Sequence, residues 1–92
     1  MKPVMYYDLT WQERRSVREQ YIKDQNGLCM YCGGDLKIPT PDHIRKKPIN
    51  WNLFPKNFLQ SPVHLQHDHE TGLTEGVVHN YCNAVLWQYE GR

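Results

Sequence analysis

The sequence has little of what would place it in a membrane or an oxidising compartment. Its 92 residues contain no apolar run near the roughly 18 residues that cross a bilayer, and mean hydropathy is −0.78. Met1–Thr10 lacks the apolar core of a secretory leader, so we expect a protein of the reducing cytoplasm with no membrane association. A formal net charge of only +1 excludes the strongly basic class of DNA-coating proteins.

Cysteine is also scarce, with three residues in the chain. An odd number in a reducing compartment argues against a disulfide framework and favours a metal site completed by another ligand type. A domain this small buries only about two-thirds of the surface that its unfolded chain exposes, so its core needs additional stabilisation. We therefore expect a single domain spanning residues 1–92, stabilised by a metal.

The N-terminal third predicts one helix over residues 11–25. Thr10 and Glu13 form the pattern of a capping box, and Asn26-Gly27 supplies a left-handed stop. The helix carries basic residues on its polar faces, which are either a solvated surface or phosphate contacts. These residues are Arg14, Arg15, Arg18 and Lys23.

The rest of the chain predicts a knuckle at 28–34, a long loop at 35–62, a hairpin and a final helix. The loop holds five of the six prolines, and loops of this length carry function or wrap another surface. We expect its apolar residues to fill a core: Trp51, Leu53, Phe54, Phe58 and Leu59. Residues 63–69 and 73–78 predict two short strands, and 79–89 a helix that Gly91 ends. The fold class is therefore small α+β.

Two pairs of metal-binding residues have the same spacing. Cys29 and Cys32 lie three apart before Gly33-Gly34, which permits the tight turn of a zinc knuckle, and His79 and Cys82 repeat that spacing. The four residues would complete a tetrahedral, structural zinc site. The alternatives are helix-start residues beside unpaired thiols, or a redox-active Cys29–Cys32 pair.

The segment Val63-His64-Leu65-Gln66-His67-Asp68-His69-Glu70 holds three histidines and two acids within eight residues. A strand gains little stability from adjacent titratable groups, so this density indicates a site; the alternative is a second metal-binding or solvated strand. The order CxxC, HxxHDHETG and G-V-V-H-x-x-C-N resembles the HNH nucleases (ββα-metal or His-Me finger), specifically the endonuclease VII-like phage branch. The resemblance covers roughly residues 28–89 apart from the loop.

The resemblance implies a treble-clef-like ββα-metal core at residues 63–90, braced by the zinc knuckle, and a DNA endonuclease or nickase. It implies that His67 is the general base, that Asn83 is a ligand of a catalytic Mg²⁺ or Mn²⁺ ion, and that His69 assists near the scissile phosphate. Imidazole titrates near neutral pH, and an amide oxygen suits a hard cation. His64 is expected to be structural.

One position departs from the family pattern. Gln66 stands where the family has Asp or His as a cation ligand. A neutral amide lacks the charge of a carboxylate and the donor strength of imidazole, so either Gln66 and Asn83 hold the cation weakly or Asp68 takes the place of Gln66. Strand alternation puts Gln66 and His67 on opposite faces, so both reach one cation only if the backbone bends there.

A second segment, Asp42-His43-Ile44, also resembles the start of an HNH motif, with His43 as base and Asp42 as cation ligand. The hairpin that directly precedes the second zinc pair favours His67 instead. Further phosphate contacts are expected from the basic residues Arg45, Lys46, Lys47 and Lys56.

The resemblance also implies a phage-encoded monomer or weak homodimer that acts on double-stranded DNA in the host cytoplasm, beside packaging or replication proteins. The rival hypothesis is a zinc-stabilised DNA- or protein-binding module whose nuclease site has decayed at Gln66.

Overall fold

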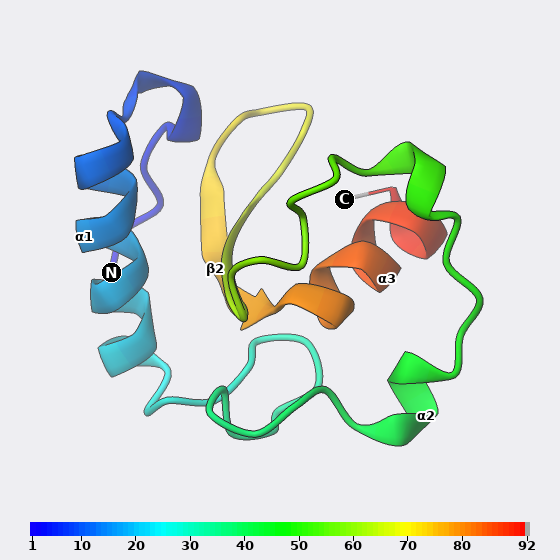
Figure 1. The fold of residues 1–92 in the computed structure, drawn as a ribbon. Coiled ribbons are helices and arrows are strands. Elements are labelled where there is room, and N and C mark those ends of the chain that lie inside the picture. The colour runs from blue at the N-terminus through cyan, green and yellow to red at the C-terminus, as the bar shows by residue number, and fades with distance from the viewer. Residues whose placement is uncertain (92) are drawn as a thin grey trace.

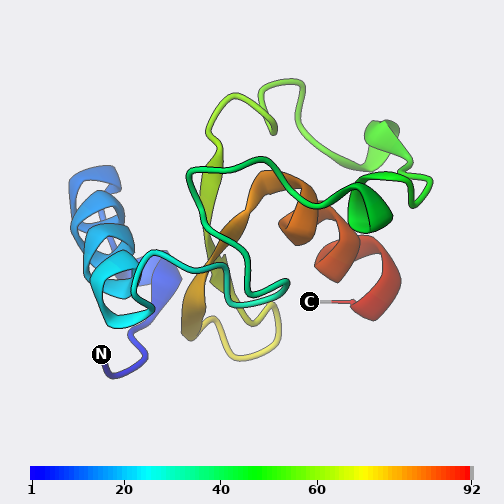
Figure 2. The same cartoon turned by 90° about the horizontal axis from the view of Figure 1, so that it is seen from below.

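A computed structural model describes residues 1–91 of the chain. It confirms a small α+β fold, in which a two-stranded antiparallel sheet lies between an N-terminal helix and a C-terminal helix (Figures 1 and 2). The elements in chain order are η1 (Tyr6–Asp8), α1 (Trp11–Asp24), α2 (Asp42–Arg45), η2 (Trp51–Leu53), β1 (Val63–His67), β2 (Thr74–His79) and α3 (Asn80–Glu90). None of the helices within the described part combines the length and apolar character needed to cross a membrane.

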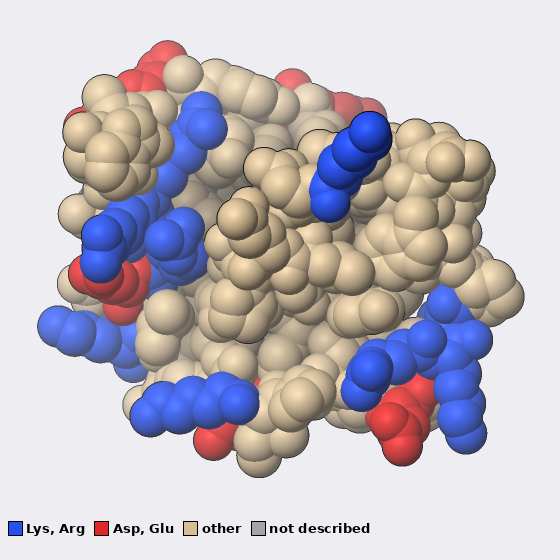
Figure 3. Space-filling view, viewed as in Figure 1, with Lys and Arg blue, Asp and Glu red and all other residues tan. Residues whose placement is uncertain are grey.

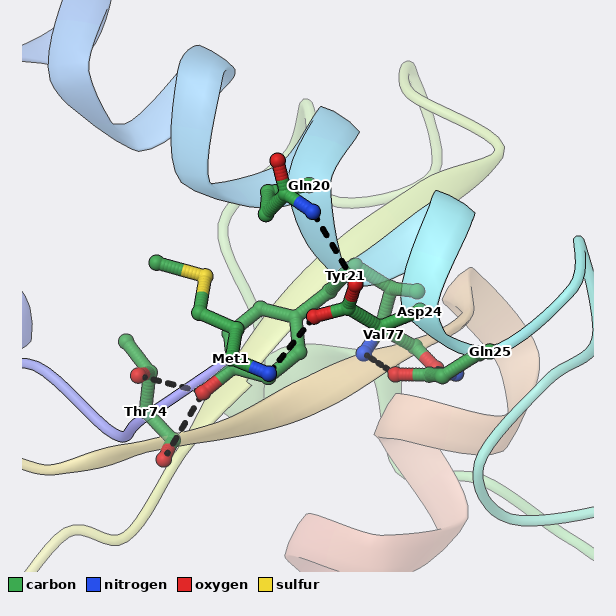
Figure 4. Close-up of polar contacts among 7 residues, drawn as sticks. All are labelled: Met1, Gln20, Tyr21, Asp24, Gln25, Thr74 and Val77. Carbon is green, nitrogen blue, oxygen red and sulfur yellow. Dashed lines mark hydrogen bonds and ion pairs between the residues drawn. The ribbon is translucent and has the colours of Figure 1, made fainter.

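Helix α1 begins where the sequence predicts and ends one residue earlier, with Gln25 as its cap. The Thr10 hydroxyl accepts the Glu13 backbone N–H, and the Glu13 carboxylate accepts the Thr10 N–H, so the capping box is complete. Asn26 and Gly27 have φ of 57° and 73° and end the helix. The buried residue of α1 is Tyr21, whose hydroxyl lies 2.9 Å from Thr74 Oγ1 at the start of β2 (Figure 4).

Gln25, the C-terminal cap of α1, attaches the helix to the outer edge of β2. Its Oε1 accepts the Val77 N–H at 2.9 Å, and its Nε2 donates to the carbonyls of Val77 and Leu28 at 3.0 and 2.7 Å. The side-chain amide thus makes the pair of hydrogen bonds to Val77 that a backbone peptide of a neighbouring strand would make (Figure 4). A Cβ at Gly76 would lie 2.6 Å from Gln25 Oε1, so a side chain at this position would displace the Gln25 amide.

Gln25→Ala is expected to lower the free energy of unfolding by about 1–3 kcal/mol, because the N–H of Val77, a fully buried residue, loses its partner. Chemical denaturation measures this change. Gln12→Ala, at an exposed position of the same helix, is the matched control and should change stability by less than about 0.5 kcal/mol. Equal effects of the two substitutions would contradict the role of Gln25.

The hairpin and α3 form the centre of the core. Val77 and Val78 of β2 and Cys82, Val85 and Leu86 of α3 are essentially inaccessible to solvent. Strand β1 ends at His67, two residues earlier than predicted, because Asp68 begins the turn. Strand β2 ends at His79, one residue later than predicted, because His79 pairs with Val63. The left-handed Gly91 ends α3 as expected.

The segment 35–62 is mostly loop, with the short elements α2 and η2 inside it. Aromatic contacts attach it to α3, where Trp51 packs on Tyr81 and Phe54 on Trp87. The expectation that all of its apolar residues fill a core is wrong in part: Trp51, Leu53 and Leu59 are 40%, 48% and 37% exposed. These side chains lie at the surface of the molecule, where the neighbouring segments cover only part of each of them.

Candidate metal centre and adjacent groove

The two predicted ligand pairs come together in space. The ligand atoms of Cys29, Cys32, His79 and Cys82 all lie within 4.8 Å of one another. Tetrahedral coordination at a Zn–S distance of about 2.3 Å requires sulfurs about 3.8 Å apart, so the four atoms need only small movements to bind one ion. The cluster can therefore hold a metal ion.

The knuckle and the β2–α3 junction position these ligands through their backbones. In the knuckle, Cys29 donates its N–H to the Gly34 carbonyl and accepts the Gly33 N–H at its own carbonyl. Gly33 has a φ of 75°, which a side chain would disfavour. At the junction, the His79 N–H points at Cys29 Sγ, 3.4 Å away. Both pairs are thus fixed by local turns that the glycines and the strand end provide.

The orientation of the His79 ring suits a metal ligand. Its Nε2 lies 2.9 and 2.7 Å from the carbonyls of Asp35 and Ile38, so Nε2 carries the proton and donates it. Nδ1 then presents its lone pair 3.4 Å from Cys32 Sγ and 3.6 Å from Cys82 Sγ. Metal-ligating histidines characteristically donate their second ring N–H to a carbonyl or carboxylate in this way.

The thiols of Cys29 and Cys82 are joined by a hydrogen bond. The hydrogen bond from Cys82 lowers the pKa of Cys29 to about 4, and the same bond raises the pKa of Cys82. Burial raises the pKa of Cys32. Cys29, His79 and Cys82 are at most 3% exposed, and this closed environment with four protein ligands is that of a structural metal site rather than a catalytic one.

A groove of about 510 Å³ lies on the other side of the hairpin, between α1 and the loop 35–62. Figure 3 shows Lys and Arg side chains along α1 beside this hollow, whose far wall is largely uncharged. Of the described residues that line the groove, none is Asp or Glu. The residues of interest in the lining are Tyr6, Arg14, Arg18, Phe58, His64, Gln66, His67, His69, Asn83 and Trp87.

His67, expected as the general base, lies in this groove. Its ring is stacked on Tyr6, with a centroid distance of 3.9 Å and an interplanar angle of 8°, and lies 4.8 Å from the ring of His69. Burial lowers the pKa of His67 below its ordinary value, and the neighbouring His69 and Arg14 charges lower it further. The imidazole is therefore neutral at neutral pH, the form that can accept a proton.

Asn83 reaches the groove from the first turns of α3, but its partner is His64. Asn83 Nδ2 lies 3.0 Å from His64 Nδ1, so Oδ1 is the amide atom left to act as a ligand. Burial lowers the pKa of His64, which keeps the imidazole neutral and able to accept this bond. His64 was expected only to pack or to bond backbone; it also positions the Asn83 amide.

The backbone bends at the point where the sequence required a bend. Gln66 pairs with Gly76 and His67 pairs with Thr74, so the register shifts by one residue and β2 has a β-bulge at Glu75. Gln66 and His67 consequently both line the groove. Gln66 is 2% exposed and its Nε2 lies 3.0 Å from the His67 carbonyl and 3.4 Å from Glu75 Oε1, which leaves its Oε1 as the ligand atom.

Asp68, the alternative cation ligand, lies in the turn after β1. Its carboxylate accepts the N–H groups of Glu70 and Thr71 at 2.7 and 3.0 Å, and Asp68 is not among the residues that line the groove. The structure therefore brings Gln66, and not Asp68, into the groove with Asn83.

The predicted basic residues divide into those that line the groove, those that lie over aromatic rings and those that are exposed to solvent. Arg14 and Arg18 line the groove, whereas Arg15 is exposed and pairs with Glu19 at 3.5 Å. Arg45 lies over the ring of Tyr81 in a separate hollow, and Lys47 lies over Tyr89. Lys46, the C-terminal cap of α2, is exposed, as is Lys56 in the loop. Asp42 and His43 begin α2 on the surface, and neither lines the groove.

Tyr6, which lines the groove, and Tyr7, which contacts His67, were not predicted from the sequence, because some sixty positions separate them from His67. Tyr7 Oη lies 3.2 Å from His67 Nε2. The adjacent aromatic pair ahead of the capping box was the available signal.

Comparison of the chain with protein-family models, with curated proteins and with solved structures gives no match in any of the three.

Proposed function

We propose that this protein is a small metal-dependent DNA endonuclease or nickase of the HNH type, with a ββα-metal core stabilised by a structural Zn²⁺ at Cys29, Cys32, His79 and Cys82. The observation that carries the proposal is the groove beside β1 and α3, where a neutral imidazole, two amide oxygens and two arginines meet. The three-cysteine, one-histidine donor set favours zinc.

The groove has the parts that phosphodiester hydrolysis needs. His67 accepts a proton from a water molecule as the water oxygen bonds to phosphorus and the bond from phosphorus to the 3′ oxygen breaks. Gln66 and Asn83 offer amide oxygens to a hard divalent cation. When bound, Mg²⁺ or Mn²⁺ would supply Lewis-acid stabilisation of the charge on the phosphate and the leaving oxygen. His69, whose ring lies 4.8 Å from that of His67, would contact the same phosphate.

Arg14 supports anion binding in the groove. Its Nε is inaccessible to solvent and has no hydrogen-bond partner among residues 1–91, and a buried unpaired donor costs about 1–3 kcal/mol. Arg14 also lines the groove, where its guanidinium would bind a phosphate oxygen. With Arg18 beside it, Arg14 offers a guanidinium fork suited to a phosphate of the DNA backbone.

The direct test is incubation of the zinc-loaded protein with supercoiled plasmid and Mg²⁺ or Mn²⁺. We expect conversion to the nicked form first, since a single groove addresses one strand. Unchanged plasmid with both ions would reject the proposal.

The lack of a carboxylate among the described residues that line the groove favours a second candidate, a zinc-stabilised module that binds DNA without cutting it. Gln66→Asp discriminates between the two. A carboxylate at this position strengthens cation binding, so an enzyme should reach half-maximal cleavage at about tenfold lower Mg²⁺, which corresponds to about 1.4 kcal/mol. The module predicts intact DNA binding and no gain in cleavage.

Gln60→Asp is the matched control for this substitution. It makes the same charge change at an exposed loop position outside the groove. Thermal melting should accompany both variants, because the new carboxylate at position 66 faces Glu75 and loses the bond to the His67 carbonyl.

A further inference from the structure

The N-terminal segment Val4–Tyr7 pairs with the end of the hairpin that carries His67. The Thr74 N–H donates to the Val4 carbonyl at 2.8 Å, and the Val4 N–H donates to Thr74 Oγ1 at 2.9 Å. The Tyr6 N–H donates to the Gly72 carbonyl at 2.8 Å. Figure 1 shows this segment running between α1 and the hairpin. Its position is therefore fixed relative to His67, the strand partner of Thr74.

This attachment places the Tyr6 ring between two groups of the groove. The Arg14 guanidinium carbon lies 4.0 Å from the centre of the ring, and the His67 ring is stacked at 3.9 Å. Two groups this close to one ring centre can only occupy its opposite faces. Arg14, Tyr6 and His67 therefore form a three-layer stack, which we call the Arg–Tyr–His stack.

A cation over a phenol ring is attracted by about 0.5–2 kcal/mol, and a stacked aromatic pair contributes about 0.5–1.5 kcal/mol beyond its buried area. These energies restrict the motion of side chains that would otherwise sample several rotamers. Tyr7 adds an edge-on contact to His67, with ring centres 5.2 Å apart. The imidazole plane is thus defined by contacts on one face and at one edge.

We infer that Tyr6 is a positioning residue of the nuclease site, whose ring holds the imidazole of His67 and the guanidinium of Arg14 at a fixed separation. The inference rests on the proposed function and adds the N-terminal segment to the site. The spacing matters because the proton acceptor and the phosphate ligand must address one phosphodiester at the same time, and a displacement of about 1 Å can cost up to 100-fold in rate.

Tyr6→Leu and Tyr6→Phe test the inference in the full chain. Leucine removes the ring, and phenylalanine keeps it. We expect kcat for plasmid nicking to fall about 10- to 100-fold in Tyr6→Leu with a smaller rise in KM, and to return to within about threefold of the wild type in Tyr6→Phe. Equal activity of all three proteins, or equal loss in both variants, would overturn the inference.

The NMR shifts of the His67 ring protons provide a second measurement that needs no activity. A ring stacked at 3.9 Å displaces these resonances upfield, and the displacement should disappear in Tyr6→Leu and persist in Tyr6→Phe. Unchanged His67 shifts in a folded, zinc-loaded Tyr6→Leu would overturn the stack whatever the activity. If the wild type cleaves no DNA but shows the ring-current shift, the proposed function fails while the geometry stands.

Discussion

Removal of the metal from the Cys29, Cys32, His79 and Cys82 cluster is expected to unfold the protein. A structural zinc contributes about 10–16 kcal/mol of apparent binding free energy at neutral pH, which is comparable with the roughly 5–15 kcal/mol by which whole domains are stable. The cluster joins the knuckle to the β2–α3 junction across almost fifty residues, and its histidine and two of its cysteines lie within the buried core. Without the ion, three thiols and an imidazole would lie close together with no metal to bind them to one another.

Metal analysis of the purified protein should give one zinc per chain, and chelation should abolish the cooperative thermal transition followed by far-UV circular dichroism. His79→Ala should reproduce this loss. His43→Ala is the matched control, because His43 is an exposed histidine at α2, and it should melt like the wild type. A chelated protein that melts at the original temperature would contradict a structural role for the metal.

His67→Ala is expected to lower the rate of plasmid nicking by about 10²–10⁴-fold, the usual contribution of a general base. In the proposed mechanism the neutral imidazole is the proton acceptor, and its pKa is held low by burial and by the His69 and Arg14 charges. DNA affinity should change little, since Arg14 and Arg18 remain in the groove. Quantitative nicking assays at saturating Mg²⁺ would measure the effect.

The same His43→Ala variant controls for this experiment in a second way, because Asp42-His43 is the competing candidate for the catalytic pair. It should retain full activity. Zinc content and melting temperature should match among all three proteins. A twofold or smaller loss in His67→Ala, or an equal loss in His43→Ala, would contradict the assignment of the base.

The sequence predicts what depends on neighbours in the chain. The capping box of Thr10, the left-handed Gly27 and the spacing of Cys29 and Cys32 are local patterns, and each has the expected structure. The second ligand pair was predictable because the same spacing recurs at His79 and Cys82. The element order followed from these signals together with the proline-rich loop.

The sequence does not predict the contacts that depend on distant pairing. The bond between His64 and Asn83 requires β1 to lie beside α3, which no local pattern specifies. The proposed chemistry requires a bend between Gln66 and His67, but the strand propensities of these residues do not predict the position of the β-bulge. The stacking of Tyr6 on His67 depends on a backbone pairing between residues seventy positions apart, since the Thr74 N–H donates to the Val4 carbonyl.

The junction between β2 and α3 constrains how the protein can evolve. His79 is both the last residue of β2 and the cap of α3, and Cys82 and Asn83 follow one turn later. Successive helical residues point about 100° apart, so one residue inserted between Cys82 and Asn83 would turn the amide away from His64 while leaving the four metal ligands in place. In descendants of this chain the number of residues from His79 to Asn83 must therefore stay fixed.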